Sequence, residues 1–319
     1  MIVTVTANAA LDRTVLVPNF QAGRRHRATS ANTAAGGKGI NVARGLRRLG
    51  IPVVVTGLAG GRTGLQIIDR LTTEGLLNDL VRIQGESRTS TAVIDPTTNI
   101  STEINEWGPE VDEHELDVLR EKLAYLAQSA RYIVFCGSLP RAVDPGLYGE
   151  LIRDAARMGV ETVLDTDAEP FNQGMQSGLT LVTPNQIEAE QLVGHEFTSA
   201  ADFEAGLDDV AGFGARDVII TREDGCYALL HDEREPIKLR ATTPTLDPVS
   251  AIGAGDALLA GYLAARYQDR NAEDAVRQAV ATGAASVLEA GAGRFDQKEA
   301  ARLASGVSVD VLAGASTAG

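Results

Sequence analysis

Short apolar runs alternate with longer amphipathic stretches along most of this 319-residue chain. The apolar runs are rich in β-branched residues and end at or beside Gly, Asp or Thr; they are Ile2–Thr6, Val53–Thr56, Tyr132–Cys136, Thr162–Asp165, Thr180–Thr183 and Val218–Thr221. The amphipathic stretches lie near residues 38–49, 63–75, 112–128, 145–158, 186–193 and 202–213, and two more follow Pro248, near 254–267 and 271–289. This alternation predicts an α/β fold, with a mostly parallel sheet between layers of helices.

Two segments break the alternation. Residues 12–34 are polar with scattered Val and Arg, and residues 88–106 have the pattern of a β-hairpin whose turn falls at 95–99. We expect these two segments to form a small β-sheet lid. The core would then comprise residues 1–11, 35–87 and 107–319, with its last segment, 308–319, frayed at the end.

Charge narrows the choice of partners. Against 29 basic residues stand 43 acidic ones, a net charge of −14, which disfavours binding to nucleic acid or to an anionic membrane. No apolar run approaches the ~18 residues of a membrane helix, and the first residues lack the basic leader of a signal peptide. With two isolated cysteines, Cys136 and Cys226, neither a disulfide framework nor a zinc site is expected. We therefore predict a cytoplasmic protein without membrane or nucleic-acid partners.

The motif Ile252-Gly-Ala-Gly-Asp-Ala257 precedes an apolar helical stretch. Backbone N–H groups at a helix N-terminus bind anions, and small residues leave them accessible. Asp256 would lie in the first turn, where an acidic residue also suits the helix dipole without any further role. In the functional interpretation it accepts the proton of a substrate hydroxyl during phosphoryl transfer. The dipole would keep it ionised and weaken it as a base, which a loose transition state tolerates.

A second glycine-rich segment, Ala35-Gly-Gly-Lys-Gly39, does not match the phosphate loop of nucleotide hydrolases, because Gly39 follows Lys38 where Ser or Thr is required. Its glycines could let the backbone approach a ligand beside Lys38 and Asn41, or it could be a flexible helix entry with a solvated lysine. No complete dinucleotide fingerprint follows a predicted strand, which argues against an oxidoreductase.

Two further patterns each have two interpretations. Asn185 and Glu188 have the spacing of a helix capping box, and beside a phosphate site their oxygens could organise Mg²⁺ through its waters. The cluster Arg24-Arg-His-Arg27 and Arg88 could be solvated loop residues. If the lid covers one site, these arginines could instead converge there on an anion, which Arg binds in a bidentate manner.

Taken in order, these motifs resemble the ribokinase/PfkB family of carbohydrate kinases, and in particular its hexose-phosphate branch. The resemblance covers nearly the whole chain. It rests on Asn8-Ala-Ala-Leu-Asp12, Gly36-Gly-Lys-Gly-Ile-Asn-Val-Ala-Arg44, Thr102-Glu-Ile-Asn105, Cys136-Gly-Ser-Leu-Pro140, Thr183-Pro-Asn-Gln-Ile-Glu188 and Gly253-Ala-Gly-Asp256.

The resemblance implies a ribokinase-like fold, ATP and Mg²⁺ as co-substrate and cofactor, and a homodimer formed through the lid sheet. It implies Asp256 as catalytic base, with Gly253, Ala254 and Gly255 as the anion hole. The acceptor-binding residues would be Asp12, Gly36, Gly37, Lys38, Asn41, Arg88, Arg25, Arg27 and Ser138. The nucleotide would contact Asn185, Thr221, Gly225, Ser250, Gly253, Gly255 and Gly283, and Mg²⁺ would be organised by Asn185, Glu188 and Asp165.

The chain departs from the family pattern twice. Glu223 stands where the nucleotide loop usually has its first Gly, and Val249-Ser-Ala-Ile252 replaces the Asp-Thr that often precedes the Gly253–Asp256 motif. The expected activity is phosphorylation of a ketohexose monophosphate, with fructose 1-phosphate as first choice and fructose 6-phosphate or tagatose 6-phosphate as alternatives. A different class, a catalytically silent sugar-phosphate sensor, is also compatible with the motifs.

Overall fold

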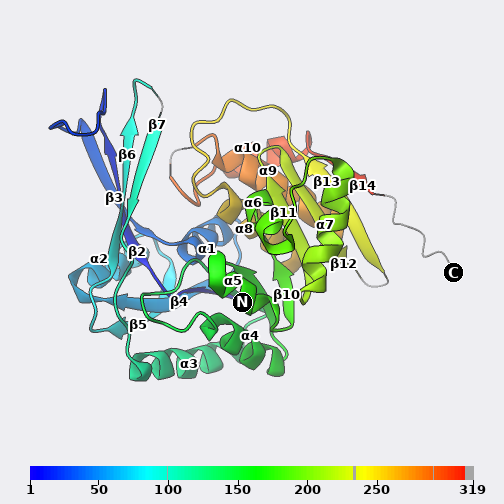
Figure 1. Cartoon of the computed structure of the whole chain (residues 1–319), viewed down its shortest axis with the longest axis horizontal. Helices are drawn as coiled ribbons and strands as arrows, with labels where there is room; N and C mark the ends of the chain where they lie inside the picture. The colour runs from blue at the N-terminus through cyan, green and yellow to red at the C-terminus, as the bar shows by residue number, and fades with distance from the viewer. Residues whose placement is uncertain (99, 233–234, 290, 313–319) are drawn as a thin grey trace.

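The computed structural model describes residues 1–98, 100–232, 235–289 and 291–312, which form a large α/β core and a small separate sheet (Figure 1). The core sheet has ten strands in the order β14-β13-β12-β11-β10-β9-β8-β1-β4-β5. From β11 to β5 neighbouring strands are parallel, whereas β11 to β14 pair antiparallel. Its strands are β1 (Ile2–Thr6), β4 (Val53–Gly60), β5 (Leu77–Ile83), β8 (Tyr132–Cys136), β9 (Glu161–Asp165), β10 (Leu179–Val182), β11 (Ala215–Arg222), β12 (Gly225–His231), β13 (Pro236–Thr242) and β14 (Ser308–Val311).

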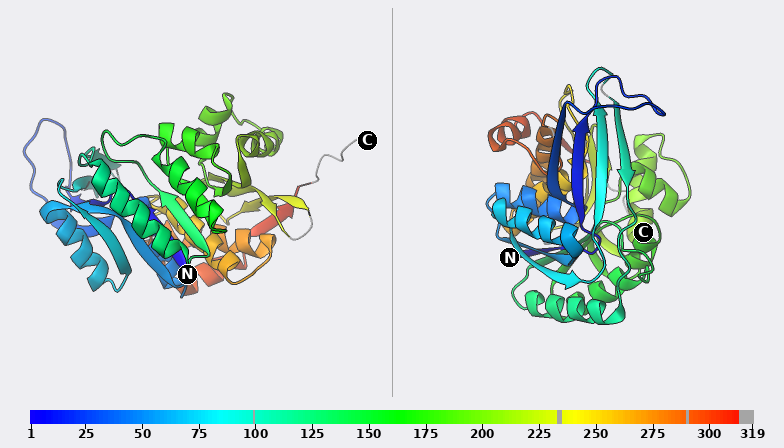
Figure 2. Two further views of the ribbon diagram at one scale, coloured as in Figure 1. Left: turned by 90° about the horizontal axis from the view of Figure 1, so that it is seen from below. Right: turned by 90° about the vertical axis from the view of Figure 1, so that its left-hand side faces the viewer.

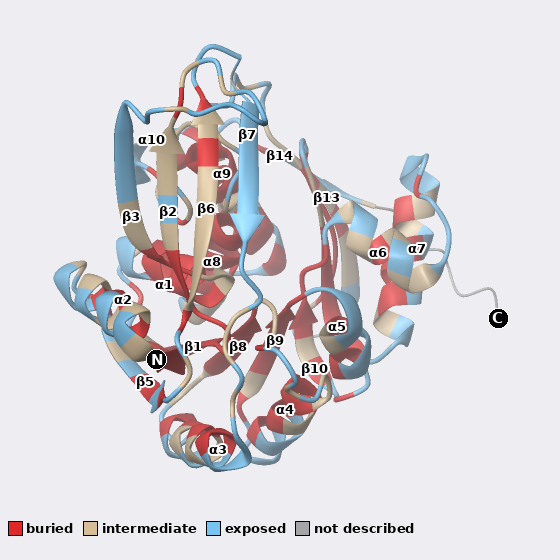
Figure 3. Ribbon diagram, turned by 60° about the vertical axis from the view of Figure 1, so that its left-hand side comes forward, coloured by how far each residue is buried: buried red, intermediate tan, exposed pale blue. Residues whose placement is uncertain are grey.

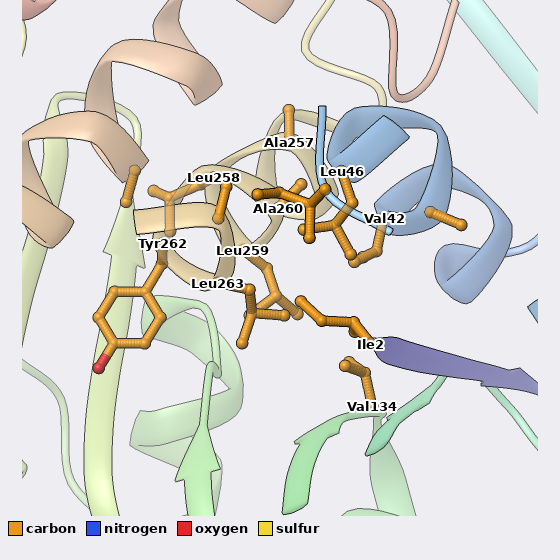
Figure 4. Close-up of a cluster of buried hydrophobic side chains, with 14 of the residues drawn as sticks. Ile2, Val42, Leu46, Val134, Ala257, Leu258, Leu259, Ala260, Tyr262 and Leu263 are labelled. Carbon is orange, nitrogen blue, oxygen red and sulfur yellow. The ribbon is translucent and has the colours of Figure 1, made fainter. Parts of the chain in front are cut away.

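Helices cover both faces of this sheet, as the sequence predicted. Side chains of β1 alternate between two buried clusters, because successive residues of a strand point to opposite faces. One cluster includes Ile2, Leu46 and Leu259 (Figure 4). The helices that contribute to it are α1 (Lys38–Arg48), α2 (Gly61–Thr73), α8 (Ala254–Tyr267), α9 (Ala272–Ser286) and α10 (Gln297–Ala304). The opposite face is covered by α3 (Glu113–Ala127), α4 (Leu147–Arg157), α5 (Ala168–Met175), α6 (Gln186–Val193) and α7 (Ala200–Gly212).

The small sheet is built from the two segments that interrupted the alternation, and it stands above the core sheet (Figure 2). Its strands, in the order β3-β2-β6-β7, are β2 (Ala10–Leu16), β3 (Ser30–Gly36), β6 (Arg88–Asp95) and β7 (Ile100–Asn105). The predicted hairpin is β6–β7, and position 99 of its expected turn lies outside the described residues. Strands β2 and β3 extend two residues beyond each end of the expected segment 12–34. We call this sheet the lid.

The final segment, residues 308–319, begins with a strand that the sequence did not predict. Residues Ser308–Val311 form β14, because they pair with Leu239–Thr242 at the edge of the core sheet. Residues 313–319 lie outside the described part of the chain. Among the described residues, no helix combines the length and the apolar character needed to cross a bilayer.

Candidate active site

A cleft of about 800 Å³ lies between the lid and the edge of the core sheet where β1, β8, β9 and β10 end. This is where ligands bind in open α/β sheets. Thirteen of the residues singled out from the sequence line it: Gly37, Lys38, Asn41, Arg88, Ser138, Asp165, Asn185, Glu188, Thr221, Gly253, Ala254, Gly255 and Asp256. The fold therefore brings together motifs that lie more than 200 positions apart in the chain.

Asp256 lies in the first turn of α8, the helix that begins after Gly253. Gly253 has a φ of 78°, and a Cβ there would come within 2.6 Å of the Ala292 Cβ. This position therefore requires glycine. The Asp256 carboxylate is buried, with 6% of the residue exposed, and its Oδ2 accepts a hydrogen bond from Asn41 Nδ2 at 2.8 Å. A carboxylate so placed, beside free N–H groups of a helix N-terminus, can accept a proton next to a bound anion.

The electrostatics of Asp256 differ from the sequence expectation. Burial and the nearby Asp165 carboxylate raise the pKa of Asp256 to about 7, and the Asn41 hydrogen bond, Lys38 and Arg44 offset this only in part. The expectation that the group is a weak base is therefore wrong, because desolvation of the buried carboxylate, the largest influence on its pKa, raises it. A carboxylate with a pKa near 7 is well matched to general-base catalysis at neutral pH.

Lys38 and Asp165 form an ion pair in the cleft. The Lys38 Nζ lies 2.9 Å from Asp165 Oδ1, and the Asp165 side chain is only 9% exposed. The attraction of Asp165 raises the pKa of Lys38, with smaller contributions from Glu188 and Asp256. Lys38 thus lies among the acidic groups that the sequence assigned to the metal and the base. Its charge compensates these carboxylates, in addition to any contact with a ligand.

Asn185 and Glu188 form the capping box that their spacing predicted. Asn185 Oδ1 accepts from the Glu188 N–H at 2.9 Å, and Glu188 Oε2 accepts from the Asn185 N–H at 2.8 Å. Both residues also line the cleft, and burial raises the pKa of Glu188. Within the described residues no three His, Cys, Asp or Glu side chains are grouped as a direct metal site. With Asp165, this oxygen-rich set fits a Mg²⁺ ion that keeps most of its waters.

Arg88 reaches the cleft from the root of the lid. Its Nε donates to the Asn8 carbonyl at 3.1 Å and its Nη1 to the Glu106 carbonyl at 3.4 Å, which leaves other N–H groups for a ligand. Asp12 and Gly36 lie beside it on the lid without lining the cleft. A Cβ at Gly36 would collide with the Asp12 carboxylate, so glycine is needed there for the carboxylate to fit. Burial raises the pKa of Asp12 to about 6.

Arg25 and Arg27 do not reach the cleft of their own chain. They are exposed in the connection beyond the Leu16–Ser30 pair, whereas the lid meets the core at the Ala10–Gly36 pair. Six residues of strand separate these pairs, about 20 Å at ~3.3 Å per residue. The convergence of all the arginines on one anion is therefore not seen within one chain.

Of the residues expected to contact the nucleotide, Asn185, Thr221, Gly253 and Gly255 line the cleft, but Gly225, Ser250 and Gly283 do not. Gly225 has a φ of 145°, and a Cβ there would collide with the Ala241 carbonyl, so this glycine serves the β12–β13 pairing. Gly283 lets α9 pack against Leu258 and Ala254 of α8. Glu223, where the family pattern has glycine, is exposed in the two-residue turn between β11 and β12.

Some polar groups of the cleft received no role from the sequence. Thr6 Oγ1, Asn8 Oδ1 and Thr183 Oγ1 are buried without a hydrogen-bond partner, and all three residues line the cleft. Such atoms are costly unless a water or a ligand satisfies them. In the sequence these residues could have been found by their position at the carboxyl ends of strands, since Thr6 ends β1, Asn8 follows it and Thr183 follows β10. Arg44 was also missed, although it follows Asn41 by one helical turn.

Comparison with known proteins agrees with this geometry. The chain is 31% identical over 289 residues to a 1-phosphofructokinase of Borreliella burgdorferi, covering 91% of this chain and 92% of the relative. A tagatose-6-phosphate kinase of Staphylococcus epidermidis is 26% identical, with 93% and 95% covered. The Escherichia coli phosphofructokinase-2 crystallised with fructose-6-phosphate is 25% identical, with a TM-score of 0.86 over 95% of this chain and 98% of that one. The model of the pfkB family of carbohydrate kinases matches residues 3–299, and the chain belongs to this family.

Proposed function

We propose that this protein is an ATP-dependent kinase that phosphorylates a primary hydroxyl of a ketohexose monophosphate, with fructose 1-phosphate as the acceptor and fructose 1,6-bisphosphate as the product. The observation that carries the proposal is the position of Asp256, buried at the N-terminus of α8 and facing a cleft that also holds Lys38 and Arg88. The relatives named 1-phosphofructokinase support the choice of acceptor.

In this reaction Asp256 takes the proton of the acceptor hydroxyl. Its Oδ2 is occupied by Asn41 Nδ2, which leaves Oδ1 to face the acceptor. The acceptor oxygen forms a bond to the γ-phosphorus as the bond from that phosphorus to the leaving oxygen of ADP breaks. The N–H groups of Gly255 and Asp256, at the start of α8, stabilise charge on the transferring phosphoryl group.

The remaining cleft residues divide into a nucleotide side and an acceptor side. We propose that Thr221, Gly225, Ser250 and Gly283 border the nucleotide, the latter three by shaping backbone rather than by lining the cleft. Asp165, Asn185 and Glu188 would hold the hydrated Mg²⁺, which supplies charge neutralisation for the phosphates. Gly37, Asn41 and Ser138 would border the sugar, with Arg88 and Lys38 near its phosphate. Asp12 and Gly36, which lie beside Arg88 without lining the cleft, would shape this side of it from the lid.

A substrate panel tests the proposal. Purified protein with ATP and Mg²⁺ is given fructose 1-phosphate, fructose 6-phosphate, tagatose 6-phosphate and fructose, and ADP release is measured. We expect the highest kcat/KM for fructose 1-phosphate and a much lower value for fructose. A higher value for either 6-phosphate would reassign the acceptor. Equal values for fructose and its phosphates would contradict a sugar-phosphate kinase, and binding without ADP release would indicate a silent sensor.

The role of Arg88 is tested with a matched control. Charge-assisted Arg–phosphate contacts contribute roughly 1.5–3 kcal/mol, so Arg88→Ala should raise the acceptor KM about tenfold or more while the KM for ATP changes little. Arg82, exposed on neighbouring β5 and outside the cleft, is the control. The assignment fails if Arg88→Ala and Arg82→Ala have the same acceptor KM.

We also propose that the protein forms a homodimer through the lid and works in the cytoplasm. The outer strand β7 is exposed along its whole length, and Ile100 and Ile104 are 61% and 60% exposed. Exposed apolar side chains on an edge strand favour pairing with another chain. Buried free thiols at Cys136 and Cys226 suit a reducing compartment.

A further inference from the structure

Arg44 is buried behind the cleft, with 7% of the residue exposed, and does not line it. Its Nε donates to Glu74 Oε2 at 2.7 Å, and its Nη2 donates to the Ala35 carbonyl at 2.8 Å and to Glu74 Oε1 at 3.3 Å. Its Nη1 donates to Asn41 Oδ1 at 2.9 Å and to the Ala292 carbonyl at 3.2 Å. The five N–H donors of a guanidinium therefore all have acceptors. A buried guanidinium held this way cannot rotate without losing several of these bonds.

The contact between Arg44 and Asn41 determines which way the Asn41 amide faces. An amide offers an acceptor oxygen on one side and a donor nitrogen on the other. Because the oxygen faces Arg44, which can only donate, the nitrogen must face Asp256, and Nδ2 lies 2.8 Å from Asp256 Oδ2. The reversed amide would place a donor against a donor and an acceptor against the carboxylate. Arg44 thus excludes the reversed orientation of the Asn41 amide, although Arg44 itself does not contact Asp256.

The other partners of Arg44 belong to the structures that border the reaction. Ala35 is the last residue but one of lid strand β3, next to Gly36. Ala292 packs against Gly253, the N-cap of α8 and the first residue of the Gly253–Asp256 motif. The same guanidinium therefore bonds to the end of lid strand β3 and to the segment that packs against Gly253. Through Asn41 it also contacts the carboxylate of Asp256.

We infer that Arg44 is a positioning residue for the phosphoryl transfer: its guanidinium fork locks the Asn41 amide so that Asp256 Oδ2 is occupied and Oδ1 is presented to the acceptor hydroxyl. This inference rests on the proposed function. Its distinguishing consequence is that Arg44 acts through Asn41. Loss of Arg44 should lower kcat while Lys38 and Arg88, the groups proposed for the sugar phosphate, stay in place.

The kinetic test compares substitutions in two backgrounds. Misalignment of a reacting group costs roughly tenfold to a hundredfold in rate, so Arg44→Met should lower kcat by that factor, with both KM values within about twofold of wild type. Arg44→Lys keeps the charge but not the fork, and it should lose kcat as Arg44→Met does. In an Asn41→Ala background, Arg44→Met should change kcat less than twofold, since the contact it acts through is gone.

Arg48→Met is the matched control. Arg48 lies one turn further along α1 and donates to the Phe295 carbonyl at 2.7 Å, in the same segment as Ala292, without touching Asn41 or Asp256. Its kcat should equal that of wild type. If Arg44→Met lowers the melting temperature below the assay temperature, Glu74→Ala replaces it. The Glu74 side chain is 27% exposed and bonds only Nε and Nη2, the side of the guanidinium away from Asn41. A smaller kcat loss is therefore expected, again absent in the Asn41→Ala background.

Several results would overturn the inference. They are equal kcat losses in both backgrounds, wild-type kcat in Arg44→Met, or full kcat in Arg44→Lys, which would make the charge alone sufficient. A measurement that does not depend on turnover distinguishes failure of this inference from failure of the proposed function. The side-chain NH₂ protons of Asn41, followed by NMR, should exchange slowly with solvent in wild type and in Arg48→Met. They should exchange fast in Arg44→Met. Slow exchange in Arg44→Met refutes the locking of the amide, whether or not the protein phosphorylates a sugar.

Discussion

At the scale of single residues, the burial of Asp256 sets the pH range in which the site can work. Its pKa is raised to about 7 by burial and by Asp165, while Asn41, Lys38 and Arg44 pull it down. A general base must be ionised, so kcat for the wild type should rise with pH through about 7 and level off above it. Asp256→Asn should lower the plateau ~10²–10⁴-fold. A flat profile between pH 5 and 8 in the wild type would contradict the role.

The same burial predicts a cost in stability. A carboxyl whose pKa is higher in the folded than in the unfolded chain favours the folded state when protonated. Its contribution is fully present below about pH 4 and is lost as the pH rises through 7. Asp256→Asn, which keeps an oxygen for Asn41 Nδ2, should therefore raise Tm by several degrees at pH 8 and leave it unchanged at pH 3.5. Asp310→Asn, on exposed β14, should show no such difference in thermal unfolding.

Membership of the cleft could be predicted from the sequence where a motif follows a strand or opens a helix. Asp256, Lys38 and Asn185 were found in this way, and the fold brings them into one cleft. The sequence could not predict that Lys38 pairs with Asp165, 127 positions away, because only the packed sheet makes them neighbours. It also could not predict the balance between dipole and burial at Asp256, since the degree of burial is a tertiary property.

At the scale of elements, the start of α8 contains two glycines that are needed for different reasons: Gly253 is the N-cap and Gly255 lies in the first turn. Gly253 has a positive φ and no room for a Cβ, whereas a Cβ at Gly255 would meet nothing within 4 Å. Gly253→Ala should therefore lower both Tm and kcat. Gly255→Ala should keep Tm or raise it, since Ala favours the helix by up to ~1 kcal/mol of unfolding free energy. It should lower kcat, because the methyl group projects beside the anion site. Thermal unfolding and initial rates of both variants check this. Wild-type rates in Gly255→Ala would contradict the assignment of the anion hole to this turn.

The capping box of α6 can be separated from its proposed second role. Gln at the third helical position caps as Glu does, so Glu188→Gln preserves the helix start and removes a charge. We expect the Mg²⁺ concentration for half-maximal rate to rise several-fold, with Tm nearly unchanged. The control is Glu115→Gln in the capping box of α3, outside the cleft. An unchanged Mg²⁺ dependence in Glu188→Gln would leave the residue as a cap only.

Most core elements were predictable because strands and helices of an α/β core have distinct hydrophobic periods. The strands that were not predicted are β5 and β14, which form the two edges of the sheet, and β12 and β13, which join β14 to the parallel strands as an antiparallel extension. This extension has no helices between its strands β11, β12 and β13, so the alternation of strands and helices does not mark it. The eight-residue helices α5 and α10 have few buried residues to mark their period. The lid strands β2 and β3 are polar, since their burial is partial, and only their departure from the pattern identified them.

At the scale of the whole molecule, the outer lid strand β7 is exposed along its whole length, whereas the inner strands β2 and β6 are mostly buried or of intermediate exposure (Figure 3). Along β7, Glu103 and Asn105 line the cleft, so the alternate residues Ile100, Thr102 and Ile104 point to the other face. The net charge of −14 makes association by surface charge unfavourable. Apolar contact through this face is therefore the interaction best able to join two chains.

The last prediction follows from this face. Ile104→Asp places a charge on an exposed strand, where it should cost the monomer little but leave an unpaired carboxylate in a lid–lid contact. We expect sedimentation velocity to give twice the 33.6 kDa chain mass for wild type and the single-chain mass for Ile104→Asp. Leu77→Asp, at a 71% exposed apolar residue on β5, should keep the wild-type mass. A wild type that sediments as a single chain, or an Ile104→Asp variant that keeps the doubled mass, would show that this face of the lid does not hold the dimer.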